Sequence, residues 1–192
     1  MMIHRRIRVS AIVVIATALA VAVVTGCGHH ESTPLVPSTS SSAPAAPPLR
    51  VDDRDPDAVL VAAAAQIYSW QPAQDPSAAA GFTRARALLD PTYIESVGAT
   101  AAGLSQVTGA TWDRWAAQHA TVTATAHIGH DDHPADTATA HQRVVVITQH
   151  ITLPNPAASE PDRVVVAYMI ASRLGSTDRW RISMIAPKEG QP

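Results

Sequence analysis

The spacing of apolar residues changes near residue 121, and this change constrains the possible folds more than any other feature of the chain. Before it, apolar residues recur every three or four positions, which is typical of one face of an α-helix. After it, apolar and polar residues alternate, which is typical of half-buried strands. Helices followed by strands with short connections predict an α+β fold, in which N-terminal helices pack on a curved four-stranded antiparallel sheet.

Aspartate–proline pairs mark where the helices begin. An aspartate caps free backbone N–H groups, and a proline is well suited to the first helical position because its φ is already helical. Asp55-Pro56 and Asp75-Pro76 both have this form, and Asp90-Pro91 ends the second apolar run. The expected helices cover residues 56–70, 78–89, 93–97 and 111–118.

Turn residues separate four alternating segments in the second half. Residues 130–134 and 175–178 are rich in Asp, Gly and Pro, as tight turns require. On the last segment, Trp180, Ile182 and Met184 alternate, so we expect all three to face the helices. The expected strands cover residues 122–128, 137–152, 163–173 and 179–186.

The N-terminus has the features of an export signal. Arg5, Arg6 and Arg8 precede the apolar segment 11–24, which is too short to span a bilayer and fits a signal peptide. The segment ends in Val24-Thr25-Gly26-Cys27, which resembles the lipobox of bacterial lipoproteins. This resemblance implies cleavage after residue 26 and a diacylglyceryl group on Cys27, the only cysteine of the chain.

Two acyl chains on Cys27 would hold the protein stably on the extracytoplasmic face of the cell membrane. An ordinary signal peptide with an incidental cysteine is the alternative. Arg5-Arg6 also partly resembles a twin-arginine motif, so the export route stays open between that pathway and general secretion. Lys188 is the only lysine against 13 arginines among 14 basic residues, which is typical of a GC-rich genome such as that of an actinobacterium.

The remaining chain divides into a tether, residues 27–50, and a domain, residues 51–192. The tether is rich in Ser, Pro and Ala and has no apolar periodicity, so it cannot form a core. The whole chain has a formal net charge of −2 and no basic run outside the signal, which argues against a nucleic-acid partner. Without the first 26 residues the charge is more negative, so membrane attachment is expected to depend on the lipid.

Residues 55–187 resemble the nuclear transport factor 2-like fold, in the order of their elements and in the closing strand Trp180-Arg181-Ile182-Ser183-Met184-Ile185. Similar actinobacterial envelope proteins include accessory proteins of mammalian-cell-entry transport operons and periplasmic scaffold subunits of conjugation and type IV secretion machines. The resemblance implies a non-catalytic scaffold or interaction module with a protein partner in the envelope. It also implies that two copies could pair through their sheets.

The same fold also occurs in isomerases and dehydratases, which place a Tyr and an Asp or His in a cone-shaped pocket. A small enzyme of this kind, or a small-ligand binder, is therefore the alternative function. No triad spacing, phosphate loop or activated nucleophile appears, so we expect neither catalysis nor a cofactor. The available side chains are Tyr68, Tyr93, Asp113, His119 and Tyr168.

A group of histidines and aspartates near the first hairpin could in principle bind a divalent metal. A polar turn explains these residues equally well, and no HExxH or CxxC motif supports a site, so no metal is expected. The group is His127, His130, Asp131, Asp132, His133 and Asp136, and a separate pair, His29 and His30, lies in the tether.

Two further sets have ordinary explanations as surface and packing residues. Arg84, Arg86 and Arg114 fit a solvated face better than an anion site. The alternating apolar residues of the second and third strands fit a packed sheet whose face could also bind a partner: Val144, Val146, Val164, Val166 and Ile170.

Overall fold

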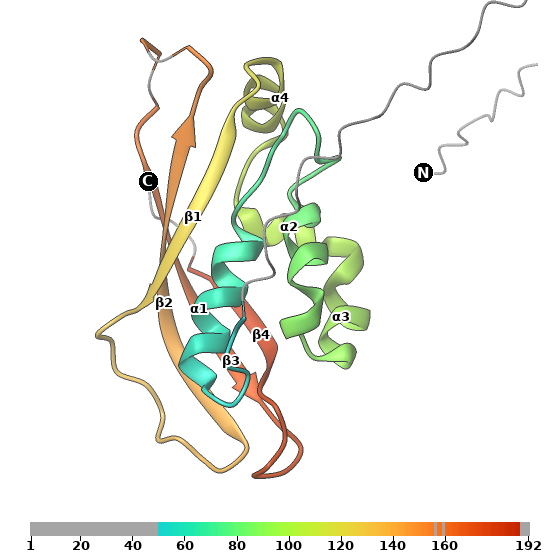
Figure 1. Cartoon of the computed structure of the whole chain (residues 1–192), viewed down its shortest axis with the longest axis vertical. Coiled ribbons are helices and arrows are strands. Elements are labelled where there is room, and N and C mark those ends of the chain that lie inside the picture. The colour runs from blue at the N-terminus through green and yellow to red at the C-terminus, as the bar shows by residue number, and fades with distance from the viewer. Residues whose placement is uncertain (1–49, 156, 159, 189–192) are drawn as a thin grey trace, which may run out of the picture. The chain divides into compact units, whose positions relative to one another are not determined.

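The structure is a computed structural model that describes residues 50–155, 157–158 and 160–188. These residues form an α+β fold, as the sequence predicts (Figure 1). The elements are α1 (Pro56–Ile67), α2 (Ala79–Arg84), the 3₁₀ helix η1 (Ala85–Leu88), α3 (Pro91–Val97), the 3₁₀ helix η2 (Gly98–Ser105), α4 (Gly109–Ala117), β1 (Thr121–Ile128), β2 (Ala140–Thr152), β3 (Arg163–Ser172) and β4 (Arg181–Pro187).

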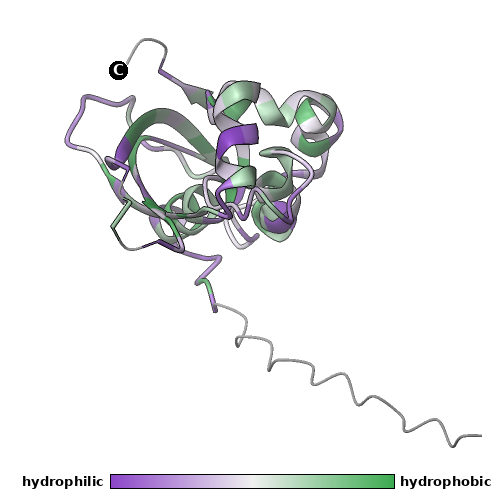
Figure 2. Ribbon diagram, turned by 90° about the horizontal axis from the view of Figure 1, so that it is seen from above, coloured by the Kyte–Doolittle hydropathy of each residue, from purple (hydrophilic) through white to green (hydrophobic). Residues whose placement is uncertain are grey.

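The four strands form one antiparallel sheet in the order β1-β2-β3-β4, so each strand pairs with the next along the chain. The helices lie on one side of the sheet, and α1 packs across all four strands (Figure 1). Seen from above, the sheet curves around the helices (Figure 2). We call the face against the helices the inner face and the opposite one the outer face.

Of the two predicted aspartate–proline helix starts, Asp55-Pro56 is confirmed, whereas Asp90-Pro91, which the sequence predicts only as the end of the second helix, also begins α3. The Asp55 side chain accepts a hydrogen bond from the Asp57 N–H, and Asp90 accepts bonds from two N–H groups of α3. The pair Asp75-Pro76 does not begin a helix. Asp75 instead accepts a bond from the Gln71 N–H and forms an ion pair with Arg84, so its residues form a turn and α2 begins later.

Several features differ from the expectation. α1 ends at Ile67, before the expected end at residue 70, and Trp70 instead forms a β-bridge to Val122. The second helix continues from α2 as η1 and ends because Leu89 is extended and forms a bridge to Ile182. The first hairpin connection runs over residues 129–139 and is longer than the expected turn. The sequence analysis missed η2, which is rich in Gly and Ala and lacks a periodic apolar face.

Trp180 is buried, as predicted, but Met184 does not share its face. Trp180 is 4% exposed and Ile182 is fully buried. The register then shifts: Ile182 pairs with Ala171, whereas Met184 pairs with Ile170 on the outer face. The extra residue of this β-bulge is Ser183, and it reverses the facing of every residue after it.

Among the described residues, no helix is both long enough and apolar enough to cross a membrane. The predicted signal peptide, the lipid acceptor Cys27 and residues 27–49 of the tether lie outside the described residues.

The close approach of α1 and α2 predicts a strong effect at Gly81. A Cβ atom there would lie 2.1 Å from the Ile67 carbonyl oxygen, so Gly81→Ala should destabilise the domain by about 1–3 kcal/mol or more. Gly98 has no atoms within 4 Å of such a Cβ, so Gly98→Ala should be neutral or slightly stabilising. Urea unfolding measures both, and equal effects would contradict the packing described.

Burial of Trp180 gives a second prediction. Its ring lies between the His141 ring, with centroids 6.1 Å apart, and the Arg173 guanidinium, 4.3 Å from the ring centroid. Trp180→Ala should therefore lower the free energy of unfolding by about 3–5 kcal/mol. The control Leu174→Ala removes a side chain that is 98% exposed and should change it little. A Trp180→Ala domain that melts like wild type would contradict this packing.

Candidate functional site

Large aromatic side chains fill the space between the helices and the inner face. Tyr68 and Trp115 are fully buried, and Trp70 is 2% exposed. The rings of Tyr68 and Trp70 lie 6.2 Å apart, and the Trp112 ring packs against Trp70 at 5.9 Å. The space between the helices and the inner face is therefore filled by side chains.

The polar groups in this interior form hydrogen bonds with other groups of the protein. The Tyr68 hydroxyl donates to the Leu104 carbonyl at 3.1 Å, and the fully buried Gln149 donates to the Tyr68 carbonyl at 2.7 Å. Gln149 also accepts a bond from Arg163. Within the described residues, every buried side-chain nitrogen or oxygen has a hydrogen-bond partner.

The side chains considered for catalysis do not come together. Burial raises the pKa of Tyr68 well above its usual range, and the Tyr93 hydroxyl accepts a bond from the Ile185 N–H. Tyr168 pairs with Val144 on the outer face. Asp113 and His119 are exposed, on and just after α4. No acid–base pair forms among these five residues.

The histidines and aspartates of the first hairpin divide into two sets. His127, His130, Asp131 and Asp132 are exposed. His133 and Asp136, by contrast, reach residues of β2 that the sequence analysis did not single out. Among the described residues, no group of three or more His, Cys, Asp or Glu side chains is arranged to hold a metal ion.

The residues of β2 that they reach are His141 and Arg143, which form an ionic cluster with Asp57 and Asp136. His141 is buried, with Nε2 2.7 Å from Asp57 and Nδ1 3.1 Å from Asp136. Arg143 donates to both oxygens of Asp136 at 2.7 Å. This pairing holds the pKa of Asp136 below its usual range. The cluster connects the loop 129–139 to the start of α1, which is a structural role.

The three arginines considered as an anion site lie apart from one another, and two of them are paired with carboxylates. Arg84 pairs with Asp75, Arg86 is exposed on η1, and Arg114 pairs with Glu160. Burial acts to raise the pKa of Glu160, but bonds from Arg114 and the Trp115 indole hold it below its ordinary value.

The outer face of the sheet carries an apolar patch that no described helix covers (Figure 1). Cross-strand pairs build it: Val146 lies opposite Val166, and Ile170 lies opposite Met184. Val164 is 47% exposed there, whereas β1 presents exposed threonines beside the patch. We call this patch the outer valine face; its residues are Val144, Val146, Val164, Val166, Tyr168, Ile170 and Met184.

The chain has no match among the known protein families, the curated proteins or the solved structures with which it was compared. The assignment of a function therefore depends on the physical features described above.

The ionic cluster predicts a pH-dependent contribution to stability. Because its pKa is lowered in the folded state, Asp136 stabilises the fold above its unfolded pKa of about 3.9, and this contribution disappears as the pH falls through the folded value. The side chain is 44% exposed, so its contribution should be within about 1 kcal/mol.

Urea unfolding of wild type and Asp136→Asn between neutral pH and pH ~3 tests this prediction. The difference in unfolding free energy should be largest near neutrality and should decrease toward the acid end. Asp132→Asn is the matched control, because Asp132 is an exposed loop residue. A difference for Asp136→Asn that does not change with pH would contradict the prediction.

Proposed function

We propose that the protein is a lipid-anchored envelope protein with a nuclear transport factor 2-like domain that acts by binding and not by catalysis. The filled interior is the observation that carries this proposal: Tyr68, Trp70 and Trp115 occupy the space that an enzyme of this fold would keep for its substrate. The lipobox-like sequence before Cys27 supports the anchor.

The outer valine face is the surface that suits a protein partner. Val164 is 47% exposed and most of the other residues of this face are half-buried, whereas Val144 is buried. A contiguous and partly exposed apolar patch of this kind is typical of interaction sites. The exposed threonines of β1 give the patch a polar rim on one side, as protein interfaces commonly have. The partner class is a component of an envelope transport, conjugation or secretion complex, or a second copy of this chain that pairs sheet to sheet.

The anchor is tested by the variant Cys27→Ser. Without the thiol no diacylglyceryl thioether can form, so the precursor should remain unlipidated and any mature protein should move to the soluble fraction. Full membrane retention of the mature variant would contradict the anchor. Cys27→Ala is a second variant of the same prediction, because it also removes the thiol.

The outer valine face is tested by crosslinking in intact envelopes. Val166→Glu places a charge at the centre of the face and should reduce capture of the partner at least about tenfold, because burying an unpaired charge costs more than ~1.4 kcal/mol. Ala99→Glu adds the same charge at an exposed position of η2, on the helix side of the domain, and should leave capture unchanged.

Capture of a transport or secretion component, or of a second copy, would support the proposal if it depends on Val166. A different result would overturn it: no capture, together with turnover of a small hydrophobic substrate that is lost on changing Tyr68 or Asp113.

A further inference from the structure

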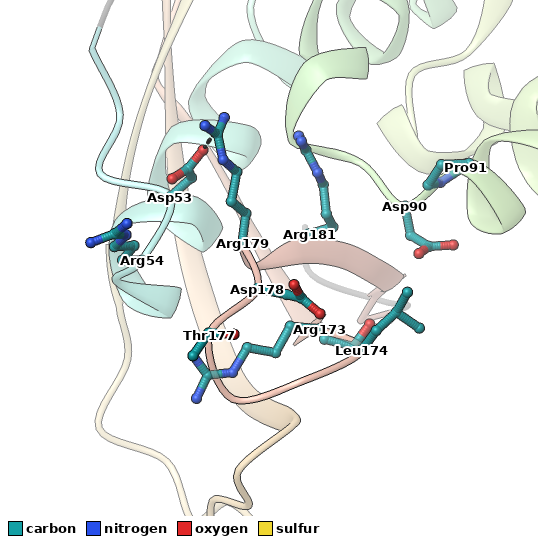
Figure 3. A pocket seen from close by; sticks show the side chains of 11 residues that line it. Asp53, Arg54, Asp90, Pro91, Arg173, Leu174, Thr177, Asp178, Arg179 and Arg181 are labelled. Atoms are coloured by element: carbon teal, nitrogen blue, oxygen red, sulfur yellow. Dashed lines mark ion pairs between the residues drawn. The ribbon is translucent and has the colours of Figure 1, made fainter.

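A second surface has a different chemistry. A hollow of about 570 Å³, open to solvent, lies between the β3–β4 hairpin, the segment before α1 and the start of α3 (Figure 3). Four arginines line it: Arg54, Arg173, Arg179 and Arg181.

The carboxylates of this hollow are already engaged. Asp90 accepts hydrogen bonds from two N–H groups of α3, and Asp178 accepts one from the Gly175 N–H at 2.8 Å. Asp53 forms an ion pair with Arg179 at 3.1 Å (Figure 3). None of the three aspartates neutralises Arg54 or Arg181.

The arginines differ in what they contact. Arg173 donates to the Ala138 carbonyl and lies over the Trp180 ring. Arg54 and Arg181, by contrast, make no side-chain hydrogen bond or ion pair to any residue that the structure describes. Arg181 is only partly exposed, on β4 at the edge of the sheet. A partly buried guanidinium without a counter-ion is suited to bind an external anion.

Arg181 also lines two adjoining hollows, one shared with Arg86 and one with Arg50 and Arg179. Three of the 14 basic residues lie in the predicted signal peptide, so six of the remaining eleven line these three hollows. We call this surface the arginine face. Four carboxylates also line these hollows, namely Asp53, Asp90, Glu95 and Asp178, so the arginines exceed the carboxylates there by two, an excess that the negative net charge of the whole chain conceals.

Two observations identify a membrane surface as the occupant. Leu174, on the rim of the hollow beside Arg173, is 98% exposed, and an apolar side chain among arginines is suited to the headgroup boundary of a bilayer. Arg50, which ends the predicted tether, lines the same face. The segment that connects the domain to the anchor on Cys27 therefore enters the domain on the arginine face.

We propose that the arginine face binds the phosphate headgroups of anionic phospholipids, with Arg181 and Arg54 as ligands and Leu174 at the acyl boundary. That this contact orients the domain relative to an anchor on Cys27 rests on the function proposed above. The binding of headgroups by the arginine face does not depend on that anchor. An oriented domain would direct its outer valine face to partners at a fixed height above the membrane.

The test uses the full chain in vesicles, with a polarity-sensitive fluorophore on Ser176→Cys in the hairpin. In vesicles with phosphatidylglycerol, the probe should be protected from the neutral quencher acrylamide, whereas in phosphatidylcholine alone it should not. Each arginine near an anionic surface contributes about fivefold at low salt, so Arg54→Gln/Arg181→Gln should shift docking about 25-fold toward the free state. Arg84→Gln/Arg114→Gln removes the same charge elsewhere and should keep the protection.

Four outcomes are informative. Protection that needs both phosphatidylglycerol and the two arginines supports the proposal. Equal protection in vesicles with and without phosphatidylglycerol overturns the proposal. Equal protection of Arg54→Gln/Arg181→Gln and Arg84→Gln/Arg114→Gln also overturns it. A response to inorganic phosphate in phosphatidylcholine vesicles, with none to phosphatidylglycerol, assigns the site to free phosphate and also overturns it. An unlipidated Cys27 would react with the fluorophore, so labelling at Cys27 would show that the lipid anchor is absent. A failure of the anchor proposal is thereby distinguished from a failure of headgroup binding.

Discussion

The packing of Tyr68 and Trp70 against the inner face of the sheet is the interaction on which the rest of this structure depends. Trp70 joins helix and sheet directly, since its backbone N–H donates to Val122 at 2.8 Å and its carbonyl accepts from the Val122 N–H at 2.9 Å. Its indole donates to the Ala78 carbonyl and so also holds the start of α2. Two residues that directly follow α1, Tyr68 and Trp70, thus bond to β1, to the start of α2 and to η2.

Because side chains fill the inner face in this way, both of the binding sites that we propose lie on the surface of the domain. The outer valine face is apolar and suits a protein, whereas the arginine face is cationic and suits an anionic surface. The outer valine face and the arginine face have no residue in common. The bulge at Ser183 directs Met184 to the outer valine face, whereas Arg181, two residues before Ser183, lines the arginine face. A single edge strand therefore contributes to both proposed contacts.

The sequence predicted the elements better than the surfaces. Prolines after aspartates and the period of two are local signals, and they placed α1, α3 and all four strands within a few residues. The face of Met184 was missed because a bulge leaves no mark in an alternating pattern. The cluster of Asp57, Asp136 and His141 was missed because residues up to 84 positions apart form it, and only the folded chain brings them together. Arg181 could not be singled out from the sequence, because only the folded chain shows that no described residue pairs with its guanidinium.

The central proposal is that the domain acts by binding and not by catalysis, and it depends on the packed interior. Crystallography of the domain under xenon pressure tests it most directly, because xenon enters dry apolar cavities and ordered waters mark polar ones. The account predicts no xenon and no water cluster between Tyr68, Trp70 and Gln149, with the Tyr68 hydroxyl bonded to Leu104. Xenon or several ordered waters in that space, with Tyr68 turned away from Leu104, would contradict it.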